Sequence, residues 1–217
     1  SAWQESMQEI LTRHKNPDIV VLLGNEAAIT YFSMSEEQYR KIPVYVLQCN
    51  NSLACLTKPY GITSVQTEKR GSIRDIKEIM KGFNVRYAEL KDYDVVANIE
   101  LIQRLYGHTH NIAVLTDNSY TGLCMQYAVK KVEERFPKFK FHYLDGRNLD
   151  MEQALERVRR LPSRTILLLG GWEIDKNEST YLSNAVYAFK NARSNVLLPV
   201  FSFSGAGSPM RVYRSIM

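Results

Sequence analysis

Residues 111–136 read NIAVLTDNSYTGLCMQYAVKKVEERF. An apolar run at Ile112–Thr116 passes through a polar turn into a helix predicted over Thr121–Phe136. A buried strand followed by a helix is the unit of parallel sheets, because parallel strands need a crossover connection of a dozen residues or more. The stretch therefore predicts an α/β fold.

The same alternation of strand and helix runs through the rest of the chain. Continuous apolar strands indicate a parallel sheet covered by helices on both faces. The predicted strands are Ile19–Leu23, Val44–Cys49, Ile62–Thr67, Val85–Leu90, Phe139–Leu144, Thr165–Leu169 and Val196–Phe203. The predicted helices are residues 3–15, a short helix from Glu26, Ile73–Met80, Val95–Tyr106, Met151–Leu161 and Ser179–Asn191.

The stretch Tyr106–Asn111 separates an irregular first half of the chain from a regular second half. Two α/β lobes are the simplest packing of this pattern. We predict lobe one over residues 1–108, lobe two over 109–203, and a return segment towards lobe one over 204–217.

Composition excludes several classes of protein. With 217 residues, 45% hydrophobic and 24% charged, the chain is typical of a globular protein, and no apolar run reaches the roughly 20 residues of a membrane helix. The net charge of +5 is spread over predicted helix faces, which favours solvated surface over a nucleic-acid partner. Cys49, Cys55 and Cys124 are too few for a disulfide scaffold. Their number decides neither the redox compartment of the protein nor whether Cys49 and Cys55 form a disulfide.

Ligands of open parallel sheets bind beyond the carboxyl ends of the strands. That rule selects five loops with short polar or aromatic side chains. Some residues of these loops have an alternative interpretation. Asn50, Asn51, Asn118 and Ser119 are favoured in turns and helix caps, and Trp172 is also a packing residue. Asp117 is expected to orient a loop rather than to contact ligand. The loops are Gly24–Glu26, Asn50–Ser52, Asp117–Thr121, Gly170–Glu173 and Phe203–Gly205.

Enzymatic motifs are weak in this sequence. Gly205-Ala206-Gly207 lacks the helix and the later acidic residue of a dinucleotide loop. There is no phosphate-binding Gly-Lys-Ser/Thr and no nucleophile-elbow serine. His108 and His110 have no Cys or His partners at metal-site spacing. The sequence therefore predicts no enzyme, no cofactor and no metal.

Four segments together resemble a known family. They are NPDIVVLLGNEAAITYF with KIPVYVLQCNN (residues 16–32 and 41–51), YDVVANIELIQRLYGHTHNIAVLTDNSYTG (93–122), LPSRTILLLGGWEID (161–175) and LPVFSFSGAG (198–207). Their order and spacing resemble periplasmic-binding-protein-like sensor domains, which are related to the substrate-binding components of ABC transporters. Such domains form the extracytoplasmic sensors of bacterial histidine kinases.

The resemblance implies a two-lobed fold that binds a small molecule in the cleft between its lobes. It implies a periplasmic location, a homodimer as a further expectation, and a membrane connection only through parts of a longer parent protein. Residues 205–217 depart from the family pattern and the first helix lacks its preceding strand, so lobe one is expected to be truncated or reduced. The implied ligand-binding residues are Asn25, Glu26, Asn50, Asn51, Asn118, Tyr120, Thr121, Trp172, Glu173, Phe203 and Ser204.

The leading hypothesis is thus a ligand-sensing domain whose closure on a sugar, nucleoside or amino-acid-like molecule signals to a partner. Three alternatives stay open. They are a transport binding protein of the same fold, a small nucleotide-using α/β enzyme with Glu173 or Asp117 as acid or base, and a module that serves dimerisation alone.

Overall fold

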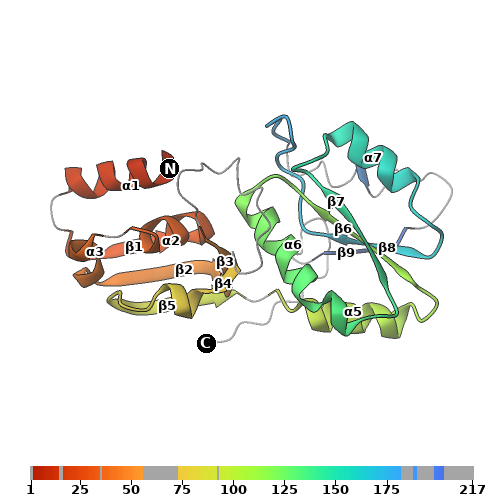
Figure 1. The fold of residues 1–217 in the computed structure, drawn as a ribbon, viewed down its shortest axis with the longest axis horizontal. Helices are drawn as coiled ribbons and strands as arrows, with labels where there is room; N and C mark the ends of the chain where they lie inside the picture. Colours follow the sequence, from red (N-terminus) through yellow and green to blue (C-terminus); the bar gives the residue numbers. More distant parts are fainter. Residues whose placement is uncertain are drawn as a thin grey trace. The chain divides into compact units, whose positions relative to one another are not determined.

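The computed structural model describes residues 2–14, 17–34, 36–55, 73–91, 93–181, 188–189 and 198–202. Within them the chain is an α/β protein with parallel sheets flanked by helices (Figure 1). It divides into two compact units, the first extending to residue 92 and the second starting at Tyr93. The boundary predicted at residue 108 falls later, beyond helix α5 (Val95–Leu105), which belongs to the second unit.

The first unit contains a parallel sheet in the order β1-β2-β5 and an antiparallel hairpin of β3 with β4. Its strands are β1 (Val20–Leu23), β2 (Val44–Asn50), β3 (Ser52–Ala54), β4 (Ile73–Asp75) and β5 (Val85–Lys91). Its helices are α1 (Ala2–Arg13), α2 (Gly24–Phe32), α3 (Glu37–Lys41) and α4 (Ile76–Ile79).

Alternate side chains of the first sheet form its core. Leu22, Val44 and Val46 are buried, and α2 contributes Ile29 and Tyr31 to the same core. Because successive residues of a strand point to opposite faces, this core occupies one face of the sheet. The apolar run of β1 therefore buries only every second residue, in the pattern buried, exposed, buried, exposed.

The second unit contains a fully parallel sheet in the order β7-β6-β8-β9. Its strands are β6 (Asn111–Thr116), β7 (Lys140–Asp145), β8 (Thr165–Leu169) and β9 (Val200–Ser202). Besides α5, its helices are α6 (Tyr120–Val132), a 3-10 turn η2 (Glu133–Arg135) and α7 (Met151–Arg159).

Helices cover both faces of this second sheet. On one face α5 and α6 pack Ile99 and Val129 against Val114, and on the other α7 packs Val158 against Leu115. The chain runs from β6 to β7 on one side and then crosses to β8 on the other. The carboxyl ends of β6 and β8 therefore form the switch point where ligands of such sheets bind.

Most of the predicted elements are confirmed within the described residues. One correction concerns Ile73–Met80, predicted as a single helix, whose first three residues form β4 and pair with β3. The predicted strand at 62–67 lies outside the described residues, as does most of the predicted helix over 179–191. Cys49, Cys55 and Cys124 are not joined in disulfide bonds, so the alternative Cys49–Cys55 disulfide is not formed.

Candidate functional site

The loops after β6 and β8 are joined through the buried side chain of Asp117. Its Oδ2 accepts a hydrogen bond from the Glu173 N–H at 2.9 Å. Its Oδ1 accepts from the Ser119 N–H at 3.1 Å and from the Ser119 hydroxyl at 2.5 Å. Ser119 in turn caps α6 by accepting from the Gly122 N–H at 2.9 Å. The expectation that Asp117 orients loops is confirmed.

Glycines allow the neighbouring loops to approach Asp117 closely. A Cβ atom on Gly122 would lie 2.2 Å from Asp117 Oδ1, and one on Gly146 would lie 2.8 Å from Asp117 Cα. A Cβ atom on Gly170 would lie 3.1 Å from the Leu115 carbonyl oxygen. The loops after β7 and β8 and the first turn of α6 thus pack directly on the end of β6, which leaves no room for side chains.

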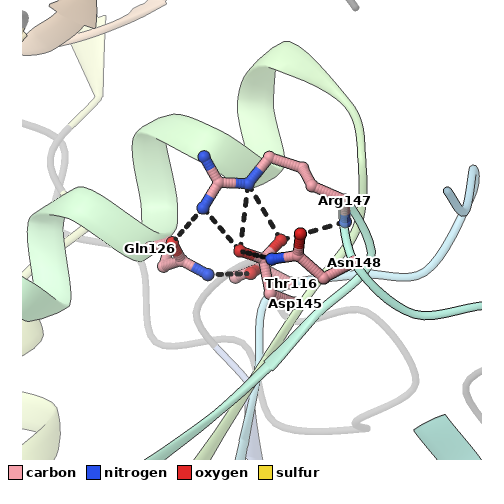
Figure 2. A network of polar contacts seen from close by, with 5 residues as sticks. All are labelled: Thr116, Gln126, Asp145, Arg147 and Asn148. Atoms are coloured by element: carbon pink, nitrogen blue, oxygen red, sulfur yellow. Dashed lines mark hydrogen bonds and ion pairs between the residues drawn. The ribbon is translucent and has the colours of Figure 1, made fainter. Parts of the chain in front are cut away.

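A second polar network links the ends of β6 and β7 to α6 (Figure 2). Arg147 donates from Nε to both carboxylate oxygens of Asp145, at 2.9 and 3.0 Å, and from Nη2 to Gln126 Oε1 at 2.6 Å. Gln126 donates to the Thr116 hydroxyl at 3.3 Å. Burial raises the pKa of Asp145, but hydrogen bonds and charge from Arg147 outweigh it and hold that pKa below its ordinary value.

The segment after β8 is held by a third carboxylate, the buried Asp175. It accepts from the Met151 N–H at the start of α7 at 3.3 Å, from the Asn177 N–H at 2.9 Å and from the Tyr181 hydroxyl at 2.6 Å. Burial raises the pKa of Asp175, but the Tyr181 hydroxyl and the backbone N–H groups outweigh it and hold the pKa low. Asn118 adds a hydrogen bond from Nδ2 to the Asp175 carbonyl oxygen at 3.2 Å.

A groove of about 490 Å³ runs between α7 and this segment. Asp150 and Asp175 line it, together with Tyr181. Both aspartates are engaged in local structure, since Asp150 caps α7 and pairs with Lys176 at 3.2 Å. The groove is therefore a polar surface whose aspartates already hold the α7 N-terminus in place.

The carboxyl edge of the first unit also holds an unpaired donor. The buried Asn25 accepts from the Asn50 N–H at 2.8 Å, which brings together the residues that follow β1 and end β2. Asn50 is 4% exposed, and its Nδ2 has no hydrogen-bond partner. Leu23 occupies the N-cap position of α2, and its side chain makes no capping hydrogen bond. A buried unpaired donor costs about 1–3 kcal/mol, so its presence needs an explanation.

The predicted residues fall into separate groups in the structure. Asn25 and Asn50 lie together, with Glu26 in the first turn of α2 and Asn51 hydrogen-bonded to β5. In the second unit, Asn118 and the exposed Glu173 meet around Asp117, whereas Tyr120 is buried and Thr121 lies in the first turn of α6. Phe203 and Ser204 lie outside the described residues.

Trp172 lies in the protein core, whereas its sequence context favoured a position in contact with ligand. The indole is 1% exposed and packs on Phe189, with ring centroids 5.2 Å apart, inside the core beneath α7. It therefore presents no stacking surface, and the alternative interpretation of Trp172 as a packing residue describes its position. Its Nε1 is buried without a hydrogen-bond partner.

The sequence reasoning missed Asp145, Arg147 and Gln126. Asp145 and Arg147 could have been found, because the strand-end rule applies to β7 as it does to the other strands. Gln126 could not, since it lies in the middle of α6 and reaches the network only through the helix packing.

None of the protein-family models, curated proteins or solved structures compared with the chain matches it. Among the described residues, no group of three His, Cys, Asp or Glu side chains could hold a metal ion. Within the same ranges, no helix has both the length and the apolar character to cross a membrane.

Replacing Gly146 with alanine tests the close approach at Asp117. The new Cβ atom meets backbone atoms that no side-chain rotation can move, so we expect Gly146→Ala to lower the free energy of unfolding by about 1–3 kcal/mol in urea. The matched control is Gly107→Ala, whose Cβ atom would lie 3.9 Å from the nearest atom and should leave stability unchanged or higher. Equal effects of the two changes would contradict the account.

Removing Asp145 tests the buried ion pair. Both side chains are 11% exposed, so Asp145→Ala leaves the Arg147 charge buried without a carboxylate and should cost about 3–5 kcal/mol. Replacing both with apolar residues, Asp145→Leu with Arg147→Met, should recover most of this loss. The control is Glu9→Ala in the exposed Glu9–Arg13 pair, where we expect less than about 1 kcal/mol. A similar loss in both single variants would count against a structural role for the network.

The low pKa values of Asp145 and Asp175 predict sensitivity to acid. A carboxyl group whose pKa is lower in the folded state stabilises the fold above its unfolded pKa, and this contribution is lost as pH falls through the folded pKa. Stability should therefore hold near neutral pH and fall below about pH 4. In the Asp175→Asn variant, the free energy of unfolding should be lower at neutral pH and should fall less steeply in acid. The free energy of unfolding of both proteins is measured against pH by chemical unfolding. Parallel curves would exclude Asp175 as a source of the acid sensitivity.

Proposed function

We propose that the chain is a small-molecule-binding domain rather than an enzyme, and that its ligand binds at the carboxyl ends of β1 and β2. The observation that carries this proposal is the Nδ2 group of Asn50, a buried donor with no partner, held beside Asn25. Such a group is costly in the free protein and is repaid when a ligand supplies an acceptor. The ligand is therefore a polar molecule that presents a carbonyl, hydroxyl or anionic oxygen.

The start of α2 supports the same position. The first N–H groups of a helix have no partners within the helix, and they favour oxygen acceptors. Here the residue before the helix, Leu23, offers no side-chain acceptor. Glu26 in the first turn adds a carboxylate that accepts hydrogen bonds from hydroxyl or amino groups. The site thus combines donors and an acceptor, which suits orientation of a polar ligand.

The carboxylates of the second unit support binding over catalysis. Asp117, Asp145 and Asp175 are buried, and each accepts several hydrogen bonds from its own loops. The pKa values of Asp145 and Asp175 are lowered, away from the neutral range that suits proton transfer. These groups fix loops in place, as a binding domain requires.

In the wider proposal the domain is the extracytoplasmic sensor of a bacterial signalling receptor, of the periplasmic-binding-protein-like class. The sequence resemblance and the α/β construction of both units support it. Ligand binding would shift the population between open and closed states and pass that shift to a partner. The sharing of a ligand by both lobes stays a prediction from the resemblance.

Replacing Asn50 with leucine separates binding from stability. A thermal-shift screen of sugars, nucleosides and amino acids first selects the compound that binds best. Asn50→Leu should weaken its binding about tenfold, as loss of a hydrogen bond worth about 1.4 kcal/mol implies. The ligand-free variant should be at least as stable as the original protein, because the unpaired buried donor is gone.

Asn98 provides the matched control. Its Nδ2 already donates to the Asp94 carbonyl oxygen at 2.8 Å, so Asn98→Leu should lower stability and leave calorimetric affinity unchanged. A folded protein that binds none of the compounds would contradict the proposal. So would an affinity that Asn50→Leu leaves unchanged.

A further inference from the structure

The second unit carries its positive charge at one edge of its sheet. Residues 93–181 contain twelve Lys and Arg side chains and twelve Asp and Glu side chains. The amino edge consists of the amino ends of β6, β7 and β8 with the helix ends that lead into them, residues 104–111, 130–140 and 156–165. These ranges contain ten of the twelve cations and three of the twelve acids. The fold therefore gathers cations that lie far apart along the sequence.

The sheet register brings these cations close together. Lys140 of β7 and the residue after Arg164 both pair with Asn111 of β6. Neighbouring strands lie about 4.8 Å apart, so the backbones at Lys140 and Arg164 are roughly 10 Å apart. Lys138 lies near the end of α5, because its Nζ donates to the Gly107 carbonyl oxygen at 3.2 Å. The cations thus form one patch across the ends of three strands.

Helix dipoles account for only part of this charge. A cation in the last turn of a helix is stabilised by the dipole, and Arg104, Lys131 and Arg157 hold such positions in α5, α6 and α7. Lys140 and Arg164 lie outside any helix, in a strand and a turn, and both are exposed. Among the described residues, no carboxylate forms an ion pair with either of them. Like charges gathered at one edge repel one another, and an anionic partner would relieve that repulsion.

Exposed apolar side chains lie at the same edge. Of the large hydrophobic side chains in the described part of the second unit, those that are exposed are Leu105, at 62%, and Tyr106, at 38%. Both follow Arg104 directly, and the Tyr106 ring packs on Phe201 of β9 with centroids 5.9 Å apart. The phosphates of a nucleic acid would engage the cations alone. An anionic bilayer also accepts a leucine at its acyl boundary and a tyrosine among its headgroups, so the combination favours a membrane.

We propose that the amino edge of the second unit binds the surface of an anionic phospholipid membrane. The cations bind the headgroup phosphates, and Leu105 enters the acyl boundary beside Tyr106. Each cation near such a surface strengthens binding about fivefold, and salt weakens it by screening the charges. The sequence resemblance implies a membrane connection only through other parts of a longer protein, whereas this contact is made by the domain itself. It depends neither on a ligand at Asn50 nor on the sensor role.

Co-sedimentation with lipid vesicles tests the proposal. The protein should sediment with vesicles of equal parts phosphatidylcholine and phosphatidylglycerol, and not with vesicles of phosphatidylcholine alone. Molar salt should release it, because the headgroup contacts are electrostatic and exposed. A protein that stays in the supernatant with both kinds of vesicle would overturn the proposal, as would binding that ignores the anionic lipid.

Removal of paired charges locates the contact. Lys140→Gln with Arg164→Asn removes two cations of the amino edge, and asparagine tolerates the left-handed φ of 58° at position 164. This variant should bind anionic vesicles about 25-fold more weakly, at about fivefold for each charge. The matched control, Lys77→Gln with Arg86→Gln, removes the same charge from exposed positions of the first unit and should bind as the original protein does. Equal losses in the two variants would overturn the proposal, since binding would then follow net charge alone.

Leu105→Ser distinguishes a membrane from another polyanion. It should weaken vesicle binding about fivefold, because a serine gains little from the acyl boundary. The control is Ile10→Ser, on a side chain 54% exposed in α1, which should leave binding unchanged. Vesicle binding that Leu105→Ser leaves unchanged would overturn the proposal. Preferential binding of a DNA duplex at equal phosphate concentration would assign the amino edge to a nucleic acid instead. Circular dichroism verifies that each variant is folded.

Discussion

The second unit depends on one constraint, the close packing of its loops around Asp117. The carboxylate joins the loops after β6 and β8, and it can do so only because the neighbouring positions 122 and 146 are glycines. Asp145 with Arg147, and Asp175 with Tyr181, then fix the remaining segments of the same edge. The result is an edge whose buried carboxylates are engaged in hydrogen bonds within the protein.

The two units therefore contribute differently. The buried carboxylates at the second unit's edge are hydrogen-bonded within the protein, and the first unit has an unpaired amide on Asn50 beside an α2 N-terminus without a side-chain cap. Unpaired polar groups cost stability, and function is one reason for a protein to retain them. We propose that ligand contact is made at the first unit's strand ends, while Asp117 and its neighbours position the loops of the second unit.

Sequence predicted the α/β class and most strands, because Thr165–Leu169 and similar runs are apolar throughout and followed by helical spacing. It also selected Asn25 and Asn50 from strand ends, but their hydrogen bond depends on β1 lying beside β2, which no local pattern reveals. The burial of Trp172 depends on the packing of Phe189, which belongs to a later segment of the chain. The exposed face of β1 was equally hidden, since an unbroken apolar run does not tell which residues a helix covers.

The most direct test of the account follows the side-chain amide of Asn50 by nuclear magnetic resonance as a binding compound is added. Formation of a hydrogen bond to the ligand should move the Asn50 NH₂ protons downfield, while the backbone signals of 116–118 and 145–148 change little. Unchanged Asn50 signals, with shifts confined to those loops of the second unit, would place the ligand elsewhere and contradict the division of roles between the two edges.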